Sequence, residues 1–179
     1  KGYKEVVLVG INLTAYGQDC GLTIADAVDA ACAVEGLERV RLGSLEPDFI
    51  TDEVISRMKA QPKLCPQFHL ALQSGCDATL KRMNRHYTAE EYADLCERLR
   101  RHFPNCAFTT DVMLGFPGET EEEFEKSLQF VESIGFAKLH VFAYSRRPGT
   151  PAAEAPHQVT AAVKTERSRR LIAVGERSG

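Results

Sequence analysis

The sequence contains no closely spaced cysteines. Its six cysteines lie at positions 20, 32, 65, 76, 96 and 106, and no two of them are within four positions of one another. This spacing excludes a Cys-x-x-Cys metal knuckle and an iron–sulfur ligand run within the sequence. Cys32 and Cys96 fall in helical patterns, where cysteine usually behaves as a small buried hydrophobe. We therefore expect six reduced thiols in a cytoplasmic protein.

Other familiar signals are absent as well. No run of about 18 apolar residues occurs, which argues against a membrane span. The chain shows no signal peptide and starts abruptly before an apolar strand, which suggests a piece of a longer protein. It has neither a Walker loop nor a G-x-G-x-x-G motif, and the acidic run Glu121–Glu123 at a helix start would repel a phosphate. These absences disfavour a phosphate-binding protein.

The charge is unevenly distributed along the chain. The total is 22 Lys and Arg against 25 Asp and Glu, with 44% hydrophobic residues, as in an ordinary single globular domain. From Ala137 onward, however, eight basic residues face three acidic ones. A basic end on an acidic body suggests contact with a polyanion, and a solvated helix face is the alternative.

Strand-like and helix-like patterns alternate along the chain. Five apolar, β-rich runs are predicted as strands: Glu5–Gly10, Arg39–Ser44, Gln67–Leu72, Cys106–Gly115 and Lys138–Ser145. Thr23, Thr51, Asp77, Thr88 and Thr120 start the intervening helices, and a last helix covers about 160–177. Such alternation predicts an α/β fold with a parallel sheet and right-handed crossovers. Because an eight-unit barrel needs about 250 residues, we expect a partial barrel or an open sheet.

The stretch Asp111–Thr120, D-V-M-L-G-F-P-G-E-T, is the clearest strand–turn–helix signal. Val112 to Leu114 continue a buried strand, and the Gly and Pro residues predict a tight turn. Thr120 and Glu123 form a capping-box pattern. Asp111 is a polar residue in an apolar strand, so it is either a satisfied structural carboxylate or part of a site.

Polar residues follow every predicted strand, at the edge where such folds bind ligands. Glu46 could hold an ammonium group, and Arg85 could clamp a carboxylate. Gln73 and Asp111 could bind a ribose diol. An amino acid joined to a nucleoside would use all four groups. Each also has an ordinary reading: a surface acid, a surface cation, a cap on strand backbone or a structural carboxylate.

Four motifs carry a resemblance to a known family. They are V-L-V-G-I-N-L-T-A-Y-G, L-Q-S-G-C-D-A-T-L-K-R-M-N-R-H-Y-T, D-V-M-L-G-F-P-G-E-T-E-E-E-F and Y-S-R-R-P-G-T-P-A. In these motifs the chain resembles the radical S-adenosylmethionine (SAM) methylthiotransferases over nearly its whole length. R-L-G-S-L-E-P and K-L-H-V-F-A-Y-S most resemble the subgroup that modifies threonylcarbamoyladenosine beside the tRNA anticodon. The isopentenyladenosine and ribosomal-protein subgroups differ at these stretches.

The resemblance implies a set of cofactors and partners. S-adenosylmethionine would bind a [4Fe–4S] cluster, and its reductive cleavage, fed by an electron donor, would give a 5′-deoxyadenosyl radical that takes hydrogen from the base. A second cluster relates to sulfur insertion, and tRNA is the expected substrate. The cofactor-binding residues would be Asn12, Ser44, Glu46, Gln73, Arg85 and Asp111. Arg146 and Arg147, after the last strand, would contact the RNA.

The chain departs from the family pattern in what it lacks. None of its cysteines reproduces the family's C-x-x-x-C-x-x-C cluster motif, so the cluster ligands are expected outside these residues. The resemblance implies a partial radical SAM barrel over 1–155, incomplete at its N-terminal side. A basic helix over 156–179 would lead toward a separate RNA-binding domain. We expect the parent to be an enzyme and this piece alone to be inactive.

Two other readings stay open. The chain could be a partial-barrel lyase or transferase without a cluster, but no lysine stands at a strand end to favour this. It could also be a non-catalytic RNA-binding module, for which Tyr144 with Arg146 and Arg147 is the available support.

Overall fold

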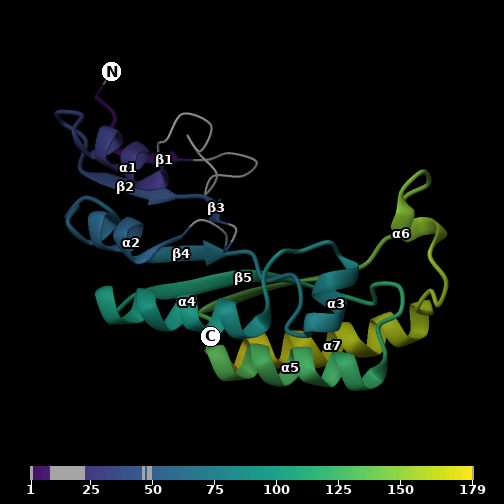
Figure 1. Ribbon diagram of the computed structural model, residues 1–179. Helices are drawn as coiled ribbons and strands as arrows, with labels where there is room; N and C mark the ends of the chain where they lie inside the picture. The colour runs from purple at the N-terminus through teal and green to yellow at the C-terminus, as the bar shows by residue number, and fades with distance from the viewer. Residues whose placement is uncertain (1, 9–22, 46, 48–49, 179) are drawn as a thin grey trace. The chain divides into compact units, whose positions relative to one another are not determined.

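The computed structural model describes residues 2–8, 23–45, 47 and 50–178. The chain divides into two compact units, whose helices and strands are drawn in Figure 1. Unit 1 comprises Lys1–Ala71 and Ala93–Phe108, and unit 2 comprises Leu72–Tyr92 and Thr109–Gly179. Among the described helices, none is both long and apolar enough to cross a membrane. Each unit is described by itself below.

Unit 1 pairs its strands in parallel. Its elements are β1 (Glu5–Leu8), α1 (Ile24–Cys32), β2 (Arg39–Leu42), β3 (Ser44–Leu45), α2 (Asp52–Lys59) and β4 (Gln67–Leu70). β1 pairs with β2, and β3 pairs with β4. The helices α1 and α2 contact each other and bury Val28, Ile55 and Met58. The alternation of one buried and one less buried residue in β2 and β4 is the period of a strand with one core face.

The predicted strand 39–44 is two strands, so the residues that the structure describes contain six strands where five were expected. β2 ends at Leu42, and the backbone N–H of Gly43 donates to the carbonyl oxygen of Leu8 at 2.8 Å. The chain then changes partner, because Ser44 lies in register with His69 of β4. An apolar run reveals the strand pattern but not the residue at which its pairing partner changes.

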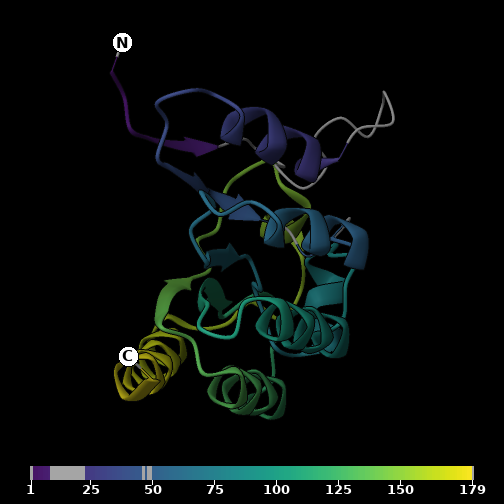
Figure 2. The ribbon, with the colours of Figure 1, turned by 90° about the vertical axis from the view of Figure 1, so that its left-hand side faces the viewer.

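Unit 2 is built on one parallel strand pair. Its elements are α3 (Asp77–Arg82), β5 (Ala107–Leu114, from Thr109 on), α5 (Glu121–Ile134), β6 (Lys138–Ala143), α6 (Pro151–Glu154) and α7 (Ala161–Ser178). α4 (Ala89–His102) begins in unit 2 and continues in unit 1. β5 and β6 run in register from Thr109↔Lys138 to Leu114↔Ala143. α7 packs on β6 and against α5, and the two helices lie side by side in both views (Figures 1 and 2).

The helix boundaries follow the local sequence. Thr120 caps α5 by accepting a hydrogen bond from the Glu123 backbone at 3.1 Å, and Gly135 ends the helix with a left-handed φ of 74°. Thr51 caps α2 in the same way. The predicted helix starts at Thr120 and Thr51 are therefore confirmed. The short helix α6 was not predicted, although Thr150 at its N-cap followed by Pro151 is an ordinary helix start.

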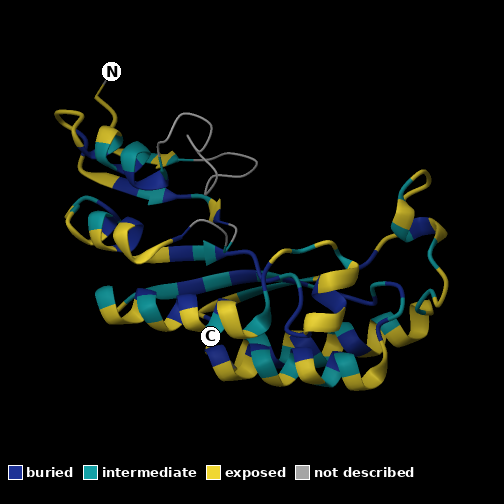
Figure 3. Cartoon of the chain, in the orientation of Figure 1, coloured by how far each residue is buried: buried dark blue, intermediate teal, exposed yellow. Residues whose placement is uncertain are grey.

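Buried residues of α5 and α7 recur at helical spacing, as the banding of Figure 3 shows. On α5 they are Phe124, Ser127, Val131 and Ile134. On α7 they include Leu171 and Val174, and also the charged residue Arg167. A buried arginine requires a partner, and that partner lies in the turn after β5.

Candidate functional site

Two glycines adopt left-handed backbone conformations in the turn after β5. Gly115 and Gly118 have φ values of 72° and 85°, which side-chain-bearing residues rarely adopt. A Cβ on Gly118 would lie 3.0 Å from Nε of Arg82, which donates to the Pro117 carbonyl at 3.2 Å. Both glycines are therefore required by the backbone conformation of the turn, and Gly118 also lies close to the Arg82 side chain of α3.

Glu119 and Arg167 form a buried ion pair that fastens this turn to α7. Arg167 Nη1 lies 2.7 Å from Glu119 Oε1 and 3.2 Å from the Glu119 carbonyl oxygen. The same Oε1 accepts a hydrogen bond from the Gly115 backbone at 2.9 Å. The two side chains are 1% and 6% exposed. Burial raises the pKa of Glu119, and the hydrogen bonds from Gly115 and Arg167 work against that rise.

A second cluster joins α3 to the start of α5. Glu123 Oε2 accepts hydrogen bonds from Arg82 Nη2 at 2.6 Å and from Thr79 Oγ1 at 3.1 Å. Burial alone would raise the pKa of Glu123, but the hydrogen bonds from Arg82, the Thr120 backbone and Thr79 outweigh it and lower the pKa. The acidic start of α5 is therefore partly neutralised by arginines of unit 2.

Gln73 lies directly beside Asp111, although 38 positions separate them in the sequence. The Gln73 backbone N–H donates to the Asp111 carbonyl at 2.9 Å, and the Gln73 carbonyl accepts from Met113 at 2.8 Å. Gln73 adopts a left-handed φ of 70°, which is uncommon for a residue other than glycine and is often found at functional sites. The structure brings these two predicted ribose-binding residues together.

The segment after Gln73 is packed tightly against α5. The Gly75 backbone N–H donates to the buried Ser127 Oγ at 2.9 Å. A Cβ on Gly75 would lie 2.8 Å from Cβ of Phe130, so the position requires glycine. This packing holds the Q-S-G turn at the carboxyl end of β5.

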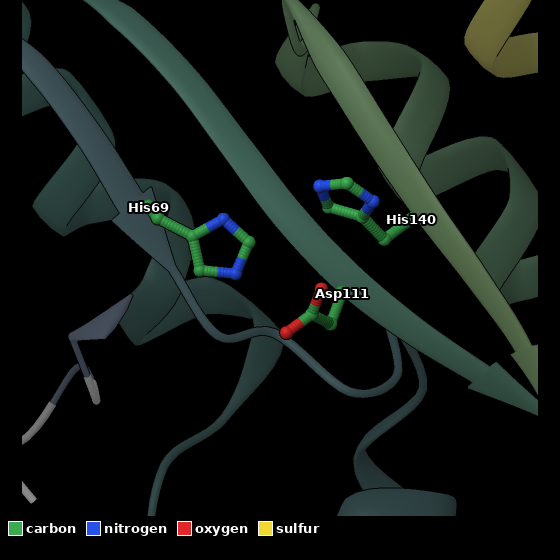
Figure 4. Close-up of side chains that lie close together, drawn as sticks. All are labelled: His69, Asp111 and His140. Atoms are coloured by element: carbon green, nitrogen blue, oxygen red, sulfur yellow. The ribbon is translucent and has the colours of Figure 1, made fainter. Parts of the chain in front are cut away.

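His140 is a neighbour of Asp111 that the sequence reasoning missed. The two residues are in register on β5 and β6, so their side chains share one face of the strand pair. The Asp111 carboxylate and a His140 ring nitrogen lie within 4.8 Å of each other. Figure 4 shows both side chains, together with His69 of β4, which belongs to unit 1. Both Asp111 and His140 are half-buried. A register argument over the strands Cys106–Gly115 and Lys138–Ser145 could have found His140.

The other predicted cofactor residues are distributed over the chain. Arg85 is half-buried in unit 2, just after α3, and its backbone donates to Leu80 at 2.9 Å. Ser44 is an exposed residue of β3 in unit 1. Asn12 and Glu46 lie outside the described residues. Unit 2 thus holds Gln73, Arg85 and Asp111, which are the amide, the guanidinium and the carboxylate expected to bind an amino acid and a ribose.

The two arginines after β6 differ in their surroundings. Arg146 Nε donates to the Ala153 carbonyl at 2.7 Å and so fixes α6 to the strand end. Arg147 lines a hollow of about 550 Å³ at the carboxyl ends of β5 and β6. Both residues are exposed. Their placement at a strand end agrees with the prediction, and their contact with RNA stays a prediction.

The basic residues of α7 are used largely within unit 2. Arg170 pairs with Glu121 at 2.5 Å and also with Glu125. Arg169 pairs with Glu166 at 2.8 Å. Lys164 Nζ donates to the Tyr144 carbonyl at 2.9 Å. These three basic residues of α7 are therefore paired with acidic residues or a carbonyl oxygen of unit 2.

Comparisons with known proteins agree with this arrangement. A sequence profile of the Radical SAM superfamily matches residues 1–131. The tRNA-2-methylthio-N(6)-dimethylallyladenosine synthases of Caldicellulosiruptor saccharolyticus and Streptomyces coelicolor are 44% and 46% identical over 98% of the chain. A threonylcarbamoyladenosine tRNA methylthiotransferase of Thermotoga maritima is 41% identical over 93% of the chain. The chain spans 35% to 38% of the length of these relatives.

Solved structures share the fold. Coproporphyrinogen III oxidase from Escherichia coli, a radical SAM enzyme, aligns with a TM-score of 0.69 and 17% identity, covering 87% of the chain and 37% of that enzyme. The radical S-adenosylmethionine methyltransferase TsrM of Kitasatospora setae aligns with a TM-score of 0.66 and 15% identity, covering 84% and 29%. At these identities the likeness shows the fold alone. The predicted α/β fold with parallel strands, of the barrel-like type found in these enzymes, is confirmed.

Proposed function

Because the chain belongs to the radical SAM superfamily, we propose that it is part of an enzyme that adds a methylthio group to an N6-modified adenosine of tRNA. The observation that carries the proposal is its 44% to 46% identity, over 98% of its length, to relatives named for that reaction. The chain is about a third of such a relative, so the reaction is proposed for the full-length protein. Its expected location is the cytoplasm, where its substrate would be.

Three residues of unit 2 have the chemistry to bind S-adenosylmethionine. Members of the superfamily use S-adenosylmethionine with a [4Fe–4S] cluster, a pair that supplies the one-electron chemistry needed to remove hydrogen from an unactivated carbon. Gln73 and Asp111 adjoin at the end of β5, where an amide and a carboxylate can hold the two hydroxyls of a ribose. Arg85 offers a planar fork for the cofactor carboxylate. The residues proposed alongside them are Asn12, Ser44 and Glu46.

The cluster ligands are proposed to lie outside this chain. The described cysteines Cys32, Cys65, Cys76, Cys96 and Cys106 are free thiols. Burial raises the pKa of Cys96 to about 12 and also raises the pKa of Cys32 and Cys106. A thiol that resists deprotonation is a poor metal ligand. We therefore expect these 179 residues alone to be inactive, and an external electron donor to be needed by the full-length enzyme.

The N6 substituent is proposed to be threonylcarbamoyl. The motifs R-L-G-S-L-E-P and K-L-H-V-F-A-Y-S support this choice. The dimethylallyl substituent is the second candidate, because the relatives named for it are 44% and 46% identical, against 41% for the relative named for threonylcarbamoyl. Sequence identities this similar do not distinguish between two substrates that undergo the same methylthio transfer.

Nucleoside mass spectrometry tests the proposal. The full-length enzyme, with its clusters reconstituted, is given two tRNAs that differ only in carrying threonylcarbamoyladenosine or dimethylallyladenosine. The proposal predicts a methylthio product from the threonylcarbamoyl tRNA. A product from the dimethylallyl tRNA alone would keep the reaction and change the substituent. No methylthio nucleoside from either tRNA, under conditions where the enzyme cleaves S-adenosylmethionine, would contradict the proposed function.

A further inference from the structure

The hollow at the carboxyl ends of β5 and β6 combines apolar and polar walls. Its volume is about 550 Å³, and its lining includes Met113, Phe142, Tyr144, Ser145, Arg147 and Thr150. Phe142 is 52% exposed, an unusual position for a large aromatic ring on a strand. A space of this size with a few convergent polar groups is typical of a small-molecule subsite.

Arg147 supplies the positive charge of this hollow. Its guanidinium has no ion pair or hydrogen bond with any other residue that the structure describes, whereas Arg82, Arg167 and Arg170 all pair with carboxylates. The backbone beneath it is ordered, because its carbonyl accepts hydrogen bonds from Thr150 Oγ1 at 2.7 Å and Thr150 N at 3.3 Å. Arg147 is therefore an unneutralised cation presented on a fixed loop.

Tyr144 adds a second polar group to the wall of the hollow. The residue is 9% exposed, and its hydroxyl has no hydrogen-bond partner in the part of the chain that the structure describes. The ring is held in place by Phe116, with centroids 5.3 Å apart, and by Lys164, whose Nζ lies 5.3 Å from the ring centroid. Buried hydroxyls nearly always have a partner, so a missing partner in the wall of a hollow points to a polar ligand.

We propose that this hollow receives the N6 substituent of the substrate adenosine, and that Arg147 pairs there with a terminal carboxylate. The inference rests on the proposed function and assigns the substituent by chemistry. A threonylcarbamoyl group carries a carboxylate, a hydroxyl and a ureido group that suit Arg147, Ser145 and Tyr144. A dimethylallyl group is a hydrocarbon and would leave the guanidinium and the tyrosine hydroxyl without partners. The hollow therefore favours the anionic substituent, and Arg147 is a specificity-determining residue.

The test compares two forms of one substrate in the full-length, reconstituted enzyme. One tRNA carries threonylcarbamoyladenosine, and the other carries its methyl ester, which removes the negative charge. The wild-type enzyme is expected to show a KM at least about tenfold lower for the acid than for the ester. Arg147→Gln should raise the KM for the acid by about the same factor and leave the KM for the ester unchanged. Tyr144→Phe should raise the KM for the acid by a smaller factor.

A matched control is Arg169→Gln, because Arg169 is an exposed arginine paired with Glu166 on α7. The Arg169→Gln variant should leave the KM for the acid and the KM for the ester unchanged. If Arg147→Gln raises the KM for the acid and for the ester equally, and also lowers the salt dependence of tRNA binding, then Arg147 contacts an RNA phosphate and the proposal is wrong. A tRNA that carries dimethylallyladenosine is included as a third substrate. A wild-type enzyme that modifies only this tRNA overturns the subsite but keeps the reaction. A wild-type enzyme that modifies none of the three tRNAs contradicts the proposed function itself.

Discussion

At the scale of single residues, the candidate site is centred on Gln73, Asp111 and His140. Gln73 and Asp111 were selected because each follows or interrupts an apolar strand, and the structure places their backbones 2.9 Å apart. The left-handed φ of Gln73 could not have been predicted, since nothing in a Gln-Ser-Gly sequence specifies which residue bears the positive φ. His140 was overlooked because a histidine in an apolar strand looks like a core residue until its register with Asp111 is known.

Substitution of the two ribose-binding candidates should weaken S-adenosylmethionine binding. In the full-length protein, Gln73→Ala and Asp111→Ala should each cost about 1–3 kcal/mol of binding free energy, because each removes a hydrogen-bonding partner from a partly buried site. Arg85→Lys should also weaken binding, since a point charge does not replace a planar fork. Isothermal titration calorimetry measures the affinities, and the exposed Gln129→Ala serves as control. Unchanged affinity in both Ala variants would mean that the ribose lies elsewhere.

Among the elements, helix boundaries were predictable and helix partners were not. The Thr120 and Glu123 capping box and the Gly135 stop are local signals, and the structure confirms them. The acidic start of α5 and the basic face of α7 read as separate features of the sequence. Folding brings them together, because Arg167 pairs with Glu119 across 48 positions and Arg170 pairs with Glu121 across 49. Only the tertiary packing of α7 against α5 shows that these charges neutralise each other.

The Glu119–Arg167 pair should be a large contributor to stability. Glu119→Ala removes the buried carboxylate of Arg167 and leaves only the exposed Glu121 carboxylate, 3.5 Å from Nη2, so it should lower the free energy of unfolding by about 3–5 kcal/mol. The double variant Glu119→Leu, Arg167→Met should cost less than the sum of the two single variants, because no uncompensated charge remains. Urea denaturation of the full-length protein measures both effects.

A matched comparison for this pair is Glu122→Ala, which removes an exposed glutamate in the first turn of α5. Glu122 is 81% exposed and 3.7 Å from Lys126, so its removal should change the free energy of unfolding by less than about 0.5 kcal/mol. Equal losses for Glu119→Ala and Glu122→Ala would show that the buried pair has no special importance.

At the scale of the whole molecule, the α/β class and the parallel pairing follow from the regular spacing of strands and helices. The prediction of one strand over 39–44 was wrong, because Gly43 divides it between two pairing partners. The proposed reaction, in contrast, could not be derived from periodicity. It rests on the resemblance carried by long motifs and on relatives 41% to 46% identical, of which the chain spans about a third.

We propose that the full-length protein uses radical SAM chemistry on the adenosine base of tRNA, and a hydrogen-transfer measurement tests this proposal most directly. The reconstituted enzyme is given tRNA that carries N6-threonylcarbamoyladenosine with deuterium at C2 of the adenine, and the 5′-deoxyadenosine formed is analysed by mass spectrometry. The account predicts that deuterium appears in 5′-deoxyadenosine together with a 2-methylthio nucleoside, and that Asp111→Ala reduces both. Formation of the methylthio nucleoside with no deuterium in 5′-deoxyadenosine would contradict it.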